Sequence, residues 1–216
     1  MRFRNGDHGY GVVTKLLHWL TVAAILGQFV VGYRMDLDDA FDDADDRLDA
    51  EADRLEEEAE GQGEEAEDRV EAEIGAREDA LDARADDEAA SVFSDVVTGD
   101  AFRDGLSLPE LHVSLGLFIL LLALVRLLWR RTTPLPPWAE HLSAGERRLE
   151  ARLEKLLLAL LFVVPATGLL LVAAGDDWLP VHVAAQIAFL VAIAAHVALV
   201  LSHTVVRRNR HLTRML

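Results

Sequence analysis

Four long apolar stretches constrain the fold of this 216-residue chain more than any other feature of its sequence. They cover residues 12–33, 111–129, 153–174 and 179–201, and each has about the 20 residues that a helix needs to cross a bilayer. The first stretch follows arginines, as in a secretory signal peptide, but its apolar run is too long and no A-x-A-like cleavage site follows it. The sequence therefore predicts an all-α integral membrane protein, built as a bundle of four transmembrane helices.

The acidic residues are concentrated in one insertion between the first two stretches. Residues 36–104 hold 29 acidic residues and six arginines, a net charge of −23, whereas the whole chain has a net charge of −16. The rest of the chain is very apolar and has a net charge of +7. This distribution indicates a basic membrane protein with one acidic insertion, and not an acidic globular domain or a nucleic-acid-binding protein.

The basic residues near the apolar stretches predict the orientation in the membrane, because cytoplasmic loops carry an excess of Lys and Arg. They precede the first stretch, lie between the second and third, and follow the fourth, whereas the connection GDDWLP has none. We expect a multi-pass protein of the plasma membrane with both termini cytoplasmic and the acidic insertion outside. The predicted segments are 1–35 (N-terminus and first helix), 36–108 (extracytoplasmic insertion), 109–131 (second helix), 132–152 (cytoplasmic loop), 153–175 (third helix) and 176–216 (fourth helix and basic tail).

The insertion is rich in Ala, Asp and Glu, of which Ala and Glu favour a helix. A thin apolar stripe at helical spacing consists of Leu48, Leu55, Val70, Ile74 and Leu81. Gly61 and Gly63 would divide the segment into two helices. A helical hairpin and disorder both stay open, because few apolar groups face much like charge. For its role, we favour a solvated surface adapted to high salt over a docking surface for a cationic partner or a cation trap, since the carboxylates lack metal-loop spacing.

The chain has no cysteine. Its absence excludes disulfides, iron–sulfur clusters held by thiolates, thiol catalysis and covalent haem attachment through a C-x-x-C-H motif. It leaves the compartment open.

Two histidines, His182 and His196, lie fourteen residues apart in the last apolar stretch. Fourteen helical residues complete almost four turns and rise ~21 Å, so both imidazoles leave one face, one near each side of a bilayer ~30 Å thick. A polar ring inside a span is costly without a partner and marks a functional site. Imidazole is also a common ligand of haem iron.

Two histidines on other spans match this pair in depth. His18 lies about 9 Å inside the cytoplasmic start of the first span, as His196 does at the end of the fourth, while His112 and His182 open their spans at the outer side. The sequence therefore predicts two level-matched pairs, His18 with His196 and His112 with His182. The competing interpretation, interfacial histidines, is strongest for His112 and weak for four residues that pair in depth.

The pairs fit two non-covalent haem b groups better than a bare metal ion. Zinc and copper use compact clusters, usually with Cys, Asp or Glu, but these pairs are ~21 Å apart and the spans offer no carboxylate at either level. Small residues leave room for a macrocycle, although they also serve close helix packing: Gly116, Ala184, Ala185, Ala188, Ala192, Ala194 and Ala195. Bis-histidine iron has no open position for oxygen, so its chemistry is one-electron transfer.

The four stretches resemble the helices of the bacterial cytochrome b561 family. The resemblance is carried by LHW in the first, H-x-S-x-G and VRLLWR in the second, P-x-T-G in the third, and the histidine spacing followed by His203 in the fourth. It covers nearly all of residues 10–34 and 108–216 and none of the insertion. The resemblance implies a di-haem, quinol-linked membrane cytochrome. In it, His18 and His196 ligate the iron of the cytoplasmic-side haem, and His112 and His182 that of the outer haem.

Charged residues near the membrane boundary are weaker cofactor-binding candidates. His203 lies ~10 Å beyond His196 on the same face, which favours a hydrogen bond to a haem propionate or an interfacial position. Arg126 and Lys15 could neutralise a propionate or snorkel to lipid headgroups, as could Arg130. The third stretch departs from the family, whose members often carry polar residues, including His, at its start; here it begins LEARLEK, and the substitutes are Lys155 and Arg152.

We therefore predict a di-haem b-type cytochrome, embedded in lipid, that transfers electrons between the quinone pool and a second redox partner. The resemblance permits an enzymatic form, superoxide oxidation at the outer face with quinone as acceptor, but no residue determines the direction. Two alternatives stay open. One is a membrane-anchor cytochrome subunit of a separate dehydrogenase or reductase, and the other is a haem-free helical scaffold.

Overall fold

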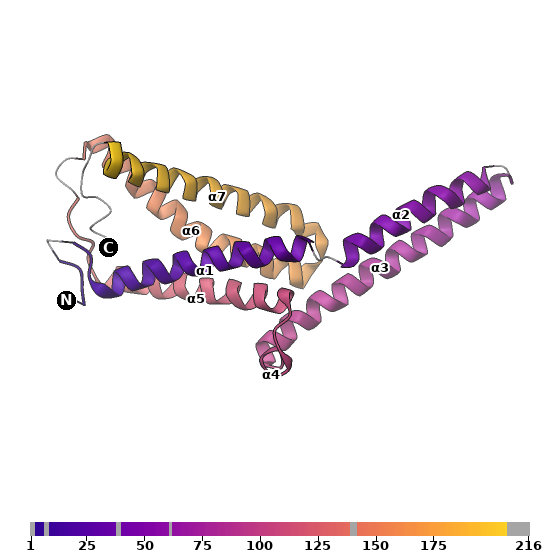
Figure 1. Ribbon diagram of the computed structural model, residues 1–216, viewed down its shortest axis with the longest axis horizontal. Helices are drawn as coiled ribbons and strands as arrows, with labels where there is room; N and C mark the ends of the chain where they lie inside the picture. Colours follow the sequence, from indigo (N-terminus) through magenta and orange to yellow (C-terminus); the bar gives the residue numbers. More distant parts are fainter. Residues whose placement is uncertain (1–2, 7–8, 38–39, 61, 139–141, 207–216) are drawn as a thin grey trace. The chain divides into compact units, whose positions relative to one another are not determined.

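The computed structural model describes residues 3–6, 9–37, 40–60, 62–138 and 142–206, which form an all-helical protein. Across these ranges no strand is present, apart from an isolated β-bridge between Gly6 and Gly9. Helices long and apolar enough to cross a membrane are α1 (Val12–Leu37), α5 (Leu108–Thr132), α6 (Ala144–Ala174) and α7 (Leu179–Leu201). They run side by side (Figure 1). This confirms the predicted all-helical fold with four candidate membrane spans.

The chain divides into two compact units. The first comprises Met1–Phe29 and Ser114–Leu216. It contains most of α1, α5, α6 and α7, which we call the four long helices because they are long and apolar enough to cross a membrane. The second comprises Val30–Val113. It holds α2 (Ala40–Ala59), α3 (Glu64–Thr98) and the short α4 (Ala101–Asp104), together with the end of α1 and the start of α5.

All four long helices contribute to one apolar core in the first unit. Its buried members are Ala24 of α1, Ile119, Leu122 and Ala123 of α5, Leu160 and Leu161 of α6, and Phe189 and Ala192 of α7. Small side chains such as Ala123, which is 0% exposed, let helices pack closely. By contrast, Leu26, Ile187 and Val191 are 62, 57 and 64% exposed. An apolar outer surface of this kind is unfavourable in water and is the surface that lipid covers in a membrane.

Helix α6 begins well before residue 153, where the sequence predicts the third span to start. Ser143 caps it: Ser143 Oγ accepts a hydrogen bond from the Glu146 backbone N–H at 3.3 Å, and Glu146 Oε2 accepts one from the Ser143 N–H at 2.8 Å. This reciprocal capping box satisfies backbone donors that a helix start leaves free. The end of the expected loop 132–152 is therefore helical from Ala144 onward.

Hydrogen bonds from Asn5 connect the start of α1 with the end of α5. Asn5 Oδ1 accepts from the Gly11 backbone N–H at 2.9 Å and from the Thr14 hydroxyl at 2.8 Å, and Asn5 Nδ2 donates to the Pro134 carbonyl at 3.1 Å. Trp129 Nε1 donates to Thr14 Oγ1 at 3.0 Å. These bonds fix the position of α1 relative to α5 along the helix axes in the first unit.

The acidic insertion folds as a helical hairpin in the second unit. Helices α2 and α3 run side by side (Figure 1). Of the apolar stripe, Ile74 is buried within the unit at 7% exposure, and the other four residues are half-buried. Helix α2 ends at Ala59 and α3 begins after Gly63, whose φ of +101° favours glycine; Gly61 lies outside the described residues. Of the two interpretations open from the sequence, the structure has the hairpin.

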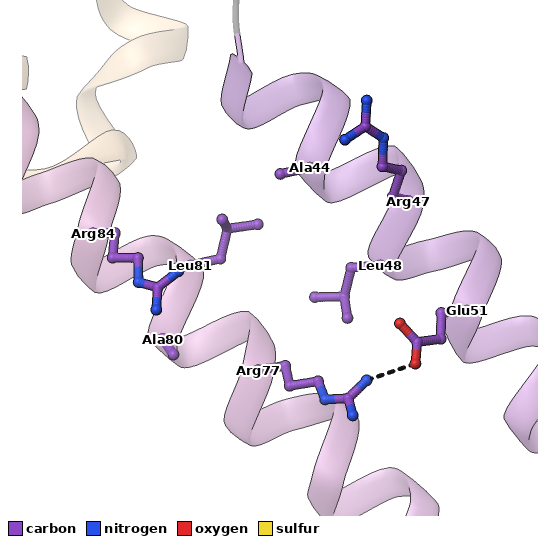
Figure 2. A pocket seen from close by; sticks show the side chains of 8 residues that line it. All are labelled: Ala44, Arg47, Leu48, Glu51, Arg77, Ala80, Leu81 and Arg84. Carbon is purple, nitrogen blue, oxygen red and sulfur yellow. Dashed lines mark hydrogen bonds and ion pairs between the residues drawn. The ribbon is translucent and has the colours of Figure 1, made fainter.

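Exposed charged side chains bridge the two hairpin helices. Arg77 of α3 donates to Glu51 of α2 at 2.9 Å and to Glu73 of its own helix at 2.8 Å. The hydrogen bond to Glu51 and the charges of both carboxylates raise the pKa of Arg77 above its ordinary value. Figure 2 shows the Arg77–Glu51 pair at a shallow groove of about 310 Å³ whose lining also includes Arg47, Leu48, Leu81 and Arg84. Such exposed ion pairs contribute little to stability.

Candidate haem-binding site

Residues from three helices meet near one end of the first unit. His18 of α1 and His196 of α7 interact electrostatically with each other, and both interact with Arg126 of α5. Both imidazoles are half-buried. The His18 and Trp19 rings lie in a T-shaped arrangement with their centroids 5.4 Å apart. This arrangement agrees with the expected proximity of His18 and His196, while their action as ligands stays a prediction.

Arg126 belongs to a charged group that we call the arginine-rich end, formed by Arg126, Arg130, Glu150, Glu154 and His203. Arg130 donates to Glu154 Oε2 at 3.0 Å, and Glu154 also interacts electrostatically with Arg126 and His196. The carboxylate therefore offsets positive charge that would otherwise accumulate beside the two histidines. Lys15, three residues before His18 on α1, is half-buried.

His203 lies in the π-helical continuation of α7, Ser202–Val206, and is only 2% exposed. Its Nε2 lies 3.4 Å from Glu150 Oε1, and the Glu150 side chain is 14% exposed. The expectation of a shallow boundary position did not include this burial. The imidazole is buried and the carboxylate is largely covered, so the two side chains form a close polar contact with little access to water.

The other predicted ligand on α7, His182, is 7% exposed and faces α6. Its Nδ1 lies 3.0 Å from Thr167 Oγ1. A Cβ at Gly168 would lie 3.1 Å from His182 Cε1, closer than ordinary van der Waals contact. The imidazole therefore rests closely on α6 at Gly168, where a larger residue would require the ring to shift.

His112 of α5 has a similar neighbour in the second unit. A Cβ at Gly32 of α1 would lie 3.3 Å from His112 Cε1. Both histidines predicted for this level thus rest on a helical glycine of another helix. His112 belongs to the second unit and His182 to the first, so their pairing stays a prediction.

One stripe of α7 carries both predicted levels. His182, Phe189 and His196 follow one another at seven-residue steps, and His203 continues the series. Seven residues are about two turns, so these side chains leave nearly one face of the helix. Phe189, halfway between the two imidazoles, is 5% exposed in the apolar core. An apolar layer therefore separates the two histidine levels.

The donor set fits haem b. Within the part of the chain that the structure describes, no cluster of three or more His, Cys, Asp or Glu could hold a bare metal ion. Instead His18 and His196 lie on separate helices, α1 and α7, and His112 and His182 each rest on a glycine of another helix. Such single imidazoles from neighbouring helices are the axial ligands that a bis-histidine haem requires.

Two acidic residues at the arginine-rich end escaped prediction. For the LEARLEK segment the sequence indicated Lys155 or Arg152, yet both are exposed, whereas Glu150 contacts His203 and Glu154 contacts Arg130. The helical period of this segment could have identified both glutamates, because it places them on the face of the helix that carries core residues. Residues 150, 154, 157 and 161 follow at steps of three or four, and Leu157 and Leu161 belong to the core face.

Comparison with known proteins adds one match. A family model, described as prokaryotic cytochrome b561, matches residues 9–216. This range contains all four long helices and the hairpin between α1 and α5. Searches among curated proteins and solved structures return no match.

Proposed function

Because this chain belongs to the prokaryotic cytochrome b561 family and is thus a b-type membrane cytochrome of electron transfer, we propose that it links the quinone pool to a second redox partner. The observation that carries this proposal is the electrostatic interaction among His18, Arg126 and His196, which come from three helices. Two imidazoles inside apolar spans beside a guanidinium suit a haem whose iron needs two nitrogen ligands and whose propionates need positive charge.

We assign two haem b groups to the four histidines. His18 and His196 would hold one, and His112 and His182 the other. Arg126 would neutralise a propionate of the first, with Lys15 as a weaker candidate. When bound, the haems supply reversible one-electron chemistry, while the protein contributes ligation, burial and nearby charge. Phe189 of the apolar core would lie between the two haem levels.

Exchange with quinol also needs a group that takes up protons, because oxidation of a quinol to a quinone releases two electrons and two protons. The contact of the buried His203 with the largely covered Glu150 at the arginine-rich end supports this part of the proposal. An imidazole that faces a carboxylate can accept a proton and pass it on. We therefore propose that quinone exchange takes place at this end.

The second partner defines the reaction class. In superoxide oxidation, two superoxide ions each lose one electron and become dioxygen, and a quinone takes up both electrons and two protons to become a quinol. Quinol formation by the protein in quinone-containing vesicles after addition of superoxide would support this form. A large redox subunit that co-purifies in constant ratio would instead support the membrane-anchor function.

The central experiment measures haem per chain in purified protein and its reduction by a quinol analogue. We expect two haems and rapid reduction. Glu150→Gln should keep both haems but slow reduction by at least about tenfold, because it removes a proton-accepting group. Glu78→Gln, an exposed change in α3, is the matched control and should reduce at the wild-type rate. A protein without a b-type band in its reduced-minus-oxidised spectrum would be the haem-free scaffold.

A further inference from the structure

The geometry points to Thr167 as the positioning residue that sets the tautomer of His182, so that Nδ1 carries the hydrogen and Nε2 presents its lone pair to iron. This inference rests on the proposed function, in which His182 is a haem ligand. It assigns a specific task to the threonine of the P-x-T-G segment, Pro165–Gly168.

The first step counts the hydrogen of one hydroxyl. Thr167 Oγ1 donates to the Val164 carbonyl oxygen at 2.8 Å, and it also lies 3.0 Å from His182 Nδ1. A threonine hydroxyl has one O–H but two acceptor lone pairs. With its hydrogen directed at Val164, the hydroxyl accepts from His182, whose ring also hydrogen-bonds to the backbone of Val164. Both hydrogen bonds form together when Nδ1 is the protonated nitrogen.

The second step concerns the remaining nitrogen. A neutral imidazole with hydrogen on Nδ1 keeps its lone pair on Nε2. His182 and Thr167 are 7% and 8% exposed, so water competes little for the bond. Gly168 limits the ring from the same helix, with its Cβ position 3.7 Å from Nε2 and 3.1 Å from Cε1. Thr167, the Val164 carbonyl and Gly168 therefore together hold both the ring and its tautomer in place.

The third step predicts an electronic effect. A metal-bound histidine that donates its other N–H to an acceptor is a more basic ligand, and loss of such a partner costs about 10–100-fold in metal affinity. A more basic axial ligand favours the oxidised iron. Removal of the Thr167 hydroxyl should therefore raise the reduction potential of one haem and weaken its retention, with little change at the His18–His196 level.

The test compares Thr167→Val, Thr167→Ser and Thr21→Val by redox titration and by haem transfer to an excess of apomyoglobin. Thr167→Val keeps the branched shape but loses the hydroxyl. It should raise the potential of one haem and speed its loss by about 10–100-fold, and Thr167→Ser should restore both values. Thr21 is the matched control: it is 2% exposed and its hydroxyl donates to the Leu17 carbonyl of its own helix at 2.6 Å. Its variant should leave the affected haem unchanged.

The outcomes separate this inference from the proposed function. A wild-type protein without haem, or a His182→Ala variant that keeps both haems, would overturn the proposed function. Two haems in the wild type, with Thr167→Val equal to it in potential and retention, would overturn the assignment of Thr167 alone. If Thr167→Val does not accumulate in membranes, Thr167→Ala replaces it, and equal potentials in the Ala and Ser variants would likewise contradict the assignment.

Discussion

The four-helix bundle and the α2–α3 hairpin use polar side chains in opposite ways. In the bundle, polar side chains such as His182 and His203 contact one particular partner away from water, Thr167 and Glu150 respectively. In the hairpin, charged groups are numerous and exposed, and Arg77 shares itself between two carboxylates whose side chains are 51 and 59% exposed. Burial makes a polar contact specific, because an unpaired polar group is costly there, whereas water pairs it readily at an exposed surface.

This difference predicts where single substitutions matter. A change in the bundle acts on one atom pair at one level of the membrane. A change in the hairpin acts on a charge density to which 29 acidic residues contribute between positions 36 and 104, so the loss of one charge is diluted. Three predictions test this contrast, and the first has the largest expected effect.

Replacement of a proposed axial ligand should remove a whole haem. His196→Ala and His18→Ala should each lose the haem at the arginine-rich end, while His182→Ala and His112→Ala should lose the other, because iron with one axial ligand is held weakly. Haem per chain and the reduced-minus-oxidised spectrum provide the measurement. His203→Ala is the control and should keep both haems, since its Nε2 faces Glu150. Two haems in all four ligand variants would rule out the assignment.

The same Gly→Ala change should have opposite signs in the two regions. Gly168→Ala in α6 puts a Cβ 3.1 Å from His182 Cε1, so the ring must shift by a few tenths of an ångström and haem should be lost faster, by up to about tenfold. Gly75→Ala in α3 meets nothing within 4 Å and should stabilise the hairpin by about 1 kcal/mol.

Haem transfer to apomyoglobin measures the first effect, and amide hydrogen exchange of α3 in the intact protein measures the second. Gly27→Ala is a further control in the bundle, because its Cβ would make an ordinary contact at 3.7 Å with Leu115 Cδ1. Faster haem loss from Gly75→Ala, or none from Gly168→Ala, would remove the distinction between the regions.

The largest change to the chain, removal of the hairpin, is expected to have the smallest effect on haem. Replacing residues 40–100 by a short flexible linker should leave membrane insertion and haem content as in the wild type, because the apolar core and the residues proposed for the cofactors lie outside this segment. Membrane fractionation and the haem spectrum provide the measurement. A deletion variant that lost haem or failed to insert would show that the hairpin is needed for the bundle.

Much of the bundle could be predicted from the sequence because the membrane simplifies the problem. Apolar stretches of the length of a span have few alternatives to a transmembrane helix, and the helical period alone puts His182 and His196 on one face of α7. Conversely, the sequence left both a hairpin and disorder open for the insertion. A thin apolar stripe in a highly charged segment gives a stabilisation by burial that is close to the cost of ordering the chain.

The contacts within the candidate site were harder to predict. Glu150 is in phase with the core face of α6, but its partner His203 lies in a π-helical turn after α7, and no pattern in SHTVV indicates that widened turn. Thr167 stands in a recognisable motif, yet its bond to His182 depends on how closely α6 packs against α7. Tertiary contacts of this kind require the packing of two helices, which periodicity does not describe.

The seven-residue series on α7 fixes the distance between the two predicted ligands of this helix. Because His182 and His196 belong to one continuous α-helix, the length of covalent chain between them determines their separation at ~21 Å. Movements of α1 or α5 would change the positions of their histidines relative to those of α7, but they would not change the distance between His182 and His196 along α7. The interval between the two levels is thus insensitive to bilayer thickness and to lipid composition. Inserting or deleting one residue between positions 182 and 196 would rotate one imidazole by about 100° relative to the other. If both imidazoles are to stay on one face of α7, the distance between them can therefore change only by whole helical turns.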